Sequence, residues 1–160
     1  MPTSTVEDYL KSILRLTRDA DGTATVGGIA EELGVTPGTV SSMMRHLSDQ
    51  NLIDYVPRKS VTLLPEGRQQ ALLVVRRHRL IEAFLVEIMR FDWSEVHEEA
   101  EVLEHVVSDR LLQRMDEILG HPSHDPHGDP IPDASGNLVE EDAHPLAEAD
   151  VGHTYRIVRV

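Results

Sequence analysis

The sequence of 160 residues contains no cysteine, which excludes a small secreted fold that disulfides hold together. Aromatic residues make up only 4% of the chain, too few for a stacking platform that binds single-stranded nucleic acid. No apolar run approaches the roughly 18 residues of a membrane-spanning helix, and the polar N-terminus does not resemble a signal peptide. We therefore expect a soluble cytoplasmic protein without a membrane partner.

Basic residues are also few, with 15 Lys and Arg against 28 Asp and Glu, which gives a net charge of −13. The deficit is uneven, because residues 1–80 carry a net charge of +1 and residues 81–160 a net charge of −14. An acidic surface approaches DNA phosphates only at a high electrostatic cost, so we expect any DNA contact in the first half. The second half gathers carboxylates and histidines, which are side chains that can hold a cation.

The first half contains the pattern of a helix-turn-helix. After a helix over residues 4–18, two short helices are predicted on either side of Gly34, over residues 26–33 and 37–49. Gly34 ends the first of the pair, Thr36 caps the second, and the second opens with a proline. Two short helices joined by such a turn are typical of DNA-binding proteins.

A basic hairpin follows this pair of helices. Residues 52–56 and 60–64 are rich in β-forming side chains and flank the tip Pro57–Lys59, which predicts a winged helix. The alternative is a three-helix bundle with an unrelated hairpin, but the hydroxyl side chains on the second short helix and the basic tip favour a DNA-binding wing. The residues that would meet phosphates and base edges are Thr36, Pro37, Thr39, Ser41, Ser42, Arg58 and Lys59.

The second half is predicted to be mainly helical. Helices are expected over residues 65–90, 95–109 and 111–119, with Ser94 as a possible cap and Gly120 as the end of the last helix. The fold class is therefore mainly α, with a winged helix followed by a helical domain.

The remaining residues form an arm and a strand. Residues 121–137 are rich in Pro, His and Asp and predict a linker or extended arm, whose histidines are most simply linker residues. Residues 151–160 alternate as a strand does, yet one strand cannot make a domain. We expect a winged helix over 1–73, a helical domain over 74–120, a linker over 121–145 and a strand over 146–160.

Four potential metal ligands share one side of the helix after Ser94. At about 100° per residue, the side chains of His97, Glu101, Glu104 and His105 fall within an arc of about 100°. Bare carboxylates on one stripe repel each other, and a divalent cation relieves that repulsion. The spacing therefore indicates a cation site, although a solvated helix face is the alternative.

Three more residues are weaker candidates. His78 and Glu82 are four residues apart on the long helix and could bind one ion together, but such pairs are more often surface pairs. A single carboxylate in a first helical turn, such as Asp8, is more often a capping or helix-dipole residue. Oxygen and nitrogen donors without thiolates suit Mn²⁺ or Fe²⁺, while Zn²⁺ or Co²⁺ would still bind in vitro.

These motifs resemble the diphtheria-toxin-repressor family of metal-activated transcriptional regulators, and within it the manganese-responsive transport regulators. The stretch from Val96 to Val106 is the most specific part of the resemblance. The other matching segments are Val6–Leu10, Ile29–Leu33, Thr36–Ser42, Leu64–Gly67, Arg77–Leu80 and Gly128–Pro132.

The resemblance implies two cation sites. The primary site would use Asp8, Glu101, Glu104 and His105, and the ancillary site would use His78, Glu82 and His97. Iron-type members have Met and Cys where this chain has Asp8 and Glu101, so two carboxylates replace sulfur donors and favour Mn²⁺ over Fe²⁺. Lys11 stands where the paired-manganese branch has Glu, and because a cation cannot be a ligand, we expect two separated sites.

The family also implies a function. We expect a homodimeric repressor, not an enzyme, that binds palindromic double-stranded DNA when metal is present and controls metal-ion transport genes. Two rival hypotheses are a metal-dependent hydrolase or storage protein with an incidental winged helix, and a winged-helix regulator of a small ligand. An Fe²⁺-dependent regulator of the same family is the nearest alternative.

Overall fold

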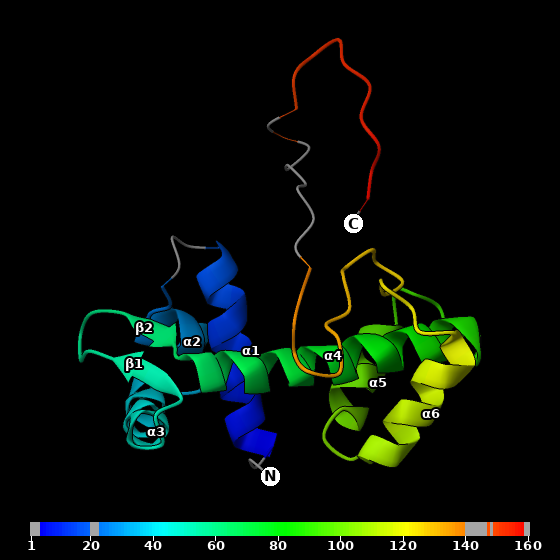
Figure 1. Ribbon diagram of the computed structural model, residues 1–160. Coiled ribbons are helices and arrows are strands. Elements are labelled where there is room, and N and C mark those ends of the chain that lie inside the picture. The colour runs from blue at the N-terminus through cyan, green and yellow to red at the C-terminus, as the bar shows by residue number, and fades with distance from the viewer. Residues whose placement is uncertain (1–3, 20–22, 140–146, 148, 159–160) are drawn as a thin grey trace. The chain divides into compact units, whose positions relative to one another are not determined.

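The computed structural model describes residues 4–19, 23–139, 147 and 149–158 (Figure 1). The chain divides into two compact units, Met1–Val75 and Arg76–Val160. The elements are α1 (Ser4–Asp19), α2 (Val26–Glu32), α3 (Pro37–Asp49), β1 (Ile53–Tyr55), β2 (Val61–Leu63), α4 (Pro65–Glu87), α5 (Val96–Leu103) and α6 (Asp109–Leu119). The mainly α fold that the sequence predicts is confirmed.

The first unit is a winged helix. Helix α1 packs against α2 and β2, while α3 packs against α2 and β1. Strands β1 and β2 pair antiparallel, with Asp54 opposite Thr62, and residue Ala24 adds a bridge to Val61. The apolar sides of α1, α2, α3 and the hairpin are buried; Ile29 of α2, for example, is 0% exposed.

Local signals at the turn of the helix-turn-helix act as predicted. The Thr36 hydroxyl accepts a hydrogen bond from the Thr39 N–H at 3.2 Å, and Pro37 opens α3. Gly34 lies between α2 and α3 with a φ of 63°, a conformation that favours glycine. The start of α3 is therefore fixed by the residues that the sequence pointed to.

The second unit has a core between the end of α4, α5 and α6. The buried side chains of this cluster are Ile81, Leu85, Val96, Ala100 and Met115. Helix α6 begins where the Ser108 hydroxyl accepts a hydrogen bond from the Leu111 N–H, and it ends at Gly120, which has a φ of 73°. The unit is thus closed by a serine cap and a left-handed glycine.

Two predicted helix ends and one predicted helix cap were wrong. Helix α4 ends at Glu87 instead of residue 90, and α5 ends at Leu103 instead of residue 109. Ser94 does not cap α5, because its hydroxyl donates to the Asp92 carboxylate at 2.6 Å and Glu95 occupies the cap position. The cap at Ser108 starts a new helix at a point where the apolar pattern alone continues.

The arm after Gly120 is folded onto α4. The Arg76 guanidinium donates to the Pro132 carbonyl at 2.7 Å and pairs with Asp116 at 2.8 Å. Arg79 donates to the Pro130 carbonyl at 2.5 Å, and the backbone of His124 bridges to Pro130. Of the two predictions for residues 121–137, an arm that belongs to the second unit describes them better than a free linker.

The C-terminal strand does not form in the described residues. Residues 149–158 contain a turn and no strand, although the sequence alternates. A strand needs a hydrogen-bonded neighbour, and alternation alone does not supply one. Residues 140–146 and 159–160, on which parts of the predicted linker and strand fall, lie outside the described residues. None of the described helices is both long enough and apolar enough to cross a bilayer.

Candidate metal centre

His78 lies at the centre of a buried group of carboxylates in the second unit. Its Nδ1 is 2.6 Å from an oxygen of Glu104, and its Nε2 is 3.0 Å from an oxygen of Glu82. All three side chains are buried, with residue exposures of 9% for His78, 3% for Glu82 and 0% for Glu104. The interpretation of His78 and Glu82 as a surface pair is therefore wrong.

Helix α5 explains why Glu104 is buried. Val96, Ala100 and Glu104 are four residues apart and fall on one side of the helix, which faces the core of the unit. The last position of that stripe therefore places a carboxylate where the first two place apolar side chains. A buried carboxylate is unfavourable unless it is paired, and here Glu104 lies against the His78 ring and 3.4 Å from the His105 ring.

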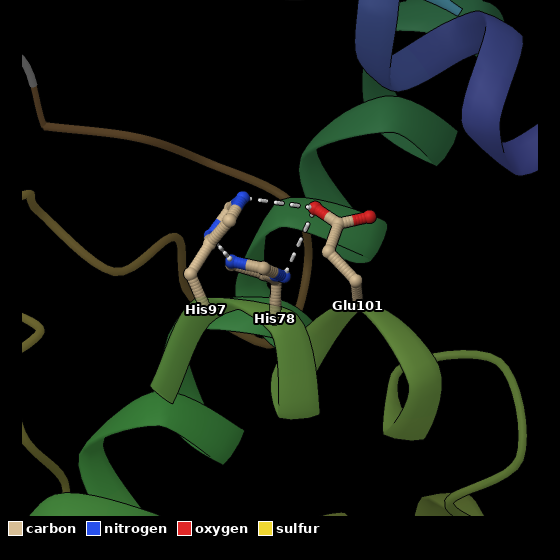
Figure 2. A group of neighbouring side chains, drawn as sticks. All are labelled: His78, His97 and Glu101. Atoms are coloured by element: carbon tan, nitrogen blue, oxygen red, sulfur yellow. Dashed lines mark hydrogen bonds and ion pairs between the residues drawn. The ribbon is translucent and has the colours of Figure 1, made fainter. Parts of the chain in front are cut away.

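His97 and Glu101 extend the group along α5 (Figure 2). The Nδ1 of His97 is 3.1 Å from the Nε2 of His78 and 3.2 Å from an oxygen of Glu82. Glu101 has an oxygen 3.7 Å from His78 and 3.6 Å from His97. His78, His97 and Glu101 each offer a donor atom within 4.8 Å of the others, a spacing that could hold a metal ion.

The structure thus brings Glu101, which the resemblance assigns to the primary site, beside His78 and His97 of the ancillary site. Glu104 in turn contacts both His78 and His105. Asp8 lies on α1 of the first unit and is half-buried. Within the second unit, the candidate ligands of both predicted sites form one continuous cluster around His78.

The arm contributes two further candidates that the sequence analysis missed. Glu82, Asp125 and His127 also offer donor atoms within 4.8 Å of one another. The His127 Nδ1 lies 3.9 Å from a Glu82 oxygen. The sequence signal that could have found them is an Asp and a His two residues apart in a Pro-rich turn, next to the matching segment Gly128–Pro132.

The surroundings set the charge of these carboxylates in opposite ways. Burial acts to raise the pKa of Glu82, but hydrogen bonds from His78 and His97 and the charge of His78 outweigh it and lower the pKa. Burial raises the pKa of Asp125, although backbone N–H groups and the Arg79 guanidinium oppose the shift. Both groups fit a cation-binding role, because a divalent ion favours the charged form of any carboxylate it contacts.

The predicted DNA-contacting residues lie on the first unit. Thr36, Pro37, Thr39 and Ser42 are exposed at the start of α3, whereas Ser41 is half-buried and its hydroxyl donates to the Pro37 carbonyl at 2.9 Å. Arg58 and Lys59 are exposed in the turn between β1 and β2. The structure therefore provides an exposed helix start and a basic wing, with the Ser41 hydroxyl hydrogen already in use.

Two family models match the chain. The N-terminal DNA-binding domain of iron-dependent repressors matches residues 1–61, and their metal-binding and dimerisation domain matches residues 64–133. Both matches cover the same regions in which the structure places the winged helix and the carboxylate cluster.

Known proteins are similar over most of this chain. The diphtheria toxin repressor of Corynebacterium efficiens is 35% identical over 142 residues, which are 88% of this chain and 61% of that protein. The regulator MntR of Listeria monocytogenes is 33% identical over 119 residues, which are 74% of this chain and 82% of that protein. The chain thus spans about three fifths of the length of the first of these relatives.

Solved structures share the fold. A manganese-dependent transcriptional repressor in complex with manganese is 44% identical and superimposes with a TM-score of 0.90 over 97% of this chain and 71% of its own. The repressor ScaR with bound Cd²⁺ is 37% identical, with a TM-score of 0.84 over 97% of this chain and 72% of its own.

Proposed function

The chain belongs to the diphtheria-toxin-repressor family of metal-dependent transcriptional regulators, and on that premise we propose that it is a Mn²⁺-responsive, homodimeric repressor. It binds palindromic operator DNA and controls metal-ion transport genes. The hypothesis of a metal-dependent hydrolase or storage protein is contradicted, because both matching models describe repressor domains.

The observation that carries the proposal is the buried cluster around His78. Glu82 and Glu104 are almost completely buried, Glu101 stands beside them, and ion pairs join all three carboxylates to the His78 ring. Carboxylates removed from water are costly unless a positive charge compensates them. A divalent cation supplies that charge and accepts the same oxygen and imidazole donors.

We assign the ligands as the sequence motifs do. The primary ion is held by Asp8, Glu101, Glu104 and His105, and the ancillary ion by His78, Glu82 and His97. The place of Asp8 in this set rests on its motif in the first helix. A ligand in the DNA-binding unit gives the metal a means to control DNA binding, since an ion that favours the DNA-binding conformation is in turn favoured by DNA.

The donor set supports Mn²⁺ as the activating metal. All seven assigned ligands offer oxygen or nitrogen atoms, and carboxylate oxygens are the donors that hard ions such as Mn²⁺ prefer. Fe²⁺ is the alternative activator, and Zn²⁺ or Co²⁺ would bind in vitro because their intrinsic affinities are higher or comparable.

Exposed apolar side chains in the second unit support the homodimer. Val102 lies on α5 and Val106 in the turn that follows it, Leu111 and Ile118 lie seven residues apart on α6, and all four side chains are exposed. Such side chains on neighbouring helices are favourable to cover in a second copy of the chain. A dimer would present two copies of α3 to a palindromic site, with half-sites about 34 Å apart.

A mobility-shift assay tests the proposal. The chain should shift a palindromic promoter fragment of a metal-transport gene with Mn²⁺ and not with EDTA, and Asp8→Ala should lose the metal-dependent shift while it remains a dimer in solution. Glu7→Ala removes the same charge from the preceding position and should keep the shift. Equal binding in EDTA would reject metal activation, and dissociation of the Asp8→Ala dimer would show that Asp8 is structural.

A further inference from the structure

We propose that Glu82 bridges two cation positions, one completed by His78 and His97 and the other by Asp125 and His127 of the arm. The second unit would then hold a pair of neighbouring ions in place of the single ancillary ion. This inference rests on the proposed metal binding and adds one ion per chain to it.

The two oxygens of Glu82 face different partners. Oε1 is 3.0 Å from the His78 Nε2 and 3.2 Å from the His97 Nδ1, whereas Oε2 is 3.9 Å from the His127 Nδ1. A carboxylate has about four lone-pair directions on its two oxygens, so it can ligate an ion on each side. The Glu82 side chain is only 4% exposed, and its direction is therefore set by these neighbours.

The His127 ring is oriented as a metal-ligating histidine usually is. Its Nε2 lies 3.2 Å from the Trp93 carbonyl oxygen, and because a carbonyl can only accept, Nε2 is the nitrogen that carries the hydrogen. The lone pair of the neutral ring is then on Nδ1, the atom that faces Glu82. A backbone carbonyl that fixes the tautomer in this way is a common second partner of histidine ligands.

Packing also holds the ring in place. The ring centroids of Trp93 and His127 are 5.7 Å apart, and the planes meet at 65°, an edge-to-face contact. The contact with Trp93 and the carbonyl contact together direct the Nδ1 toward Glu82. The orientation is an observation independent of the acidic residues themselves.

Asp125 is prepared in a similar manner. Its side chain is 2% exposed, and Oδ1 accepts hydrogen bonds from the N–H groups of His127 and Asp129, both at 2.9 Å. The Arg79 Nε stands 3.5 Å from Oδ2, beyond the roughly 2.7–3.2 Å of a strong N–H···O bond. The hydrogen bonds to Oδ1 thus hold the carboxylate in one orientation. The long contact at Oδ2 leaves lone pairs on that oxygen with which it can bind a metal ion.

Arg79 keeps the arm ligands beside α4. Its guanidinium donates to the Pro130 carbonyl at 2.5 Å and pairs with Asp129 at 3.3 Å. The turn that carries Asp125 and His127 is therefore attached to the helix that carries Glu82 through these Arg79 contacts. Two carboxylates and one imidazole, all within 4.8 Å of one another, are suitable ligands for Mn²⁺ or Fe²⁺.

A shared carboxylate also lowers the electrostatic repulsion between two adjacent cations. Its negative charge lies between the two cations, and protein sites of this kind hold ions about 3.5–4 Å apart. At such a separation two Mn²⁺ ions are magnetically coupled, and their electron paramagnetic resonance spectrum differs from that of isolated ions. The pair can therefore be told apart from two distant sites.

The experiment compares Mn²⁺ stoichiometry and spectra of the whole chain. Equilibrium dialysis should find one ion more than the primary and ancillary sites account for, and the resonance spectrum should show a coupled pair. His127→Ala and Asp125→Asn should each bind one ion fewer and lose the coupled signal; Asp125→Asn keeps an oxygen acceptor for the arm N–H groups in case His127→Ala unfolds the arm. His121→Asn removes an exposed arm histidine and should change neither result.

The outcomes separate the two proposals. If the wild-type chain binds Mn²⁺ but both variants keep its stoichiometry and spectrum, the Glu82 bridge is refuted while the repressor proposal stands. If metal-dependent DNA binding survives in the His127→Ala variant with one ion fewer, the bridge is supported and is not required for repression. If wild type binds no Mn²⁺ at all, both proposals fail.

Discussion

Replacing Gly67 with alanine should destabilise the winged helix, although the residue lies in a helix. Gly67 is buried in the first turn of α4, and a Cβ atom built there would stand 2.0 Å from the Leu52 carbonyl oxygen and 2.9 Å from its carbon. Non-bonded heavy atoms pack at about 3.5–4.0 Å, so the backbone before β1 would have to move by more than about 1 Å. That same oxygen accepts the Leu64 N–H at 3.0 Å, a bond that joins the two ends of the hairpin.

The size of the effect follows from two opposing terms. Overpacking costs about 1–3 kcal/mol and here meets backbone, which yields less easily than a side chain. Alanine gains about 1 kcal/mol over glycine inside a helix. Because the contact is with backbone, we take the upper end of that cost and expect Gly67→Ala to lower the free energy of unfolding of the first unit by about 2 kcal/mol.

Urea unfolding with a matched control measures this. Gly27→Ala on α2 places its Cβ 4.0 Å from the nearest atom, the Thr25 hydroxyl oxygen, so it should be neutral or stabilising by up to about 1 kcal/mol. Circular dichroism follows both units, and fluorescence of the single tryptophan, Trp93, follows the second unit. A Gly67→Ala protein as stable as wild type would refute the close-contact argument.

Two further changes test the helix caps and the choice of metal. Ser108→Ala removes the hydroxyl that caps α6, and it should cost about 1 kcal/mol of stability, a fall of about 2–4 °C in thermal midpoint. The control Ser94→Ala removes a hydroxyl that does not cap α5. Equal thermal midpoints for the two variants would contradict this assignment. Asp8→Met combined with Glu101→Cys should shift activation of DNA binding from Mn²⁺ toward Fe²⁺, because sulfur donors replace two oxygen donors. An unchanged metal preference in the mobility-shift assay would defeat the argument that these carboxylates select Mn²⁺.

The features that short-range chemistry decides could be predicted from the sequence. Thr36, Pro37 and Gly34 fix the helix-turn-helix through a cap, a preset φ and a left-handed residue, and each acts within a few positions. The end of α5 at Leu103 could not be predicted in this way, because apolar residues continue beyond it. The position of the break between α5 and α6 depends on how α6 packs on the core, which is a tertiary property.

Helical spacing also predicted the candidate ligands on α5 only in part. It placed His97 and Glu104 in one arc, yet their side chains are 63% and 0% exposed. The difference arises because Glu104 continues the buried stripe of Val96 and Ala100, whereas His97 follows Val96 on the adjoining side. The proposed arm ligand His127 escaped prediction because its place beside Glu82 depends on contacts between the arm and α4.

The basic residues of α4 change the electrostatic argument for DNA binding. Arg76, Arg77 and Arg79 fall in the half of the sequence with net charge +1, but they belong to the second unit and pair there with Asp116, Asp109 and the carboxylates of the arm. Residues 1–75 carry seven Lys and Arg against nine Asp and Glu, a net charge of −2.

The first unit therefore has no excess of positive charge with which to attract a DNA duplex. Its affinity for DNA has to come from local groups such as Arg58 and Lys59 at the wing. In a chain of net charge −13, each bound Mn²⁺ adds two positive charges and lowers the repulsion between the protein and phosphates at any distance within the screening length. The proposed metal activation would thus have an electrostatic component that does not depend on any change of shape, and its contribution should diminish as salt concentration rises.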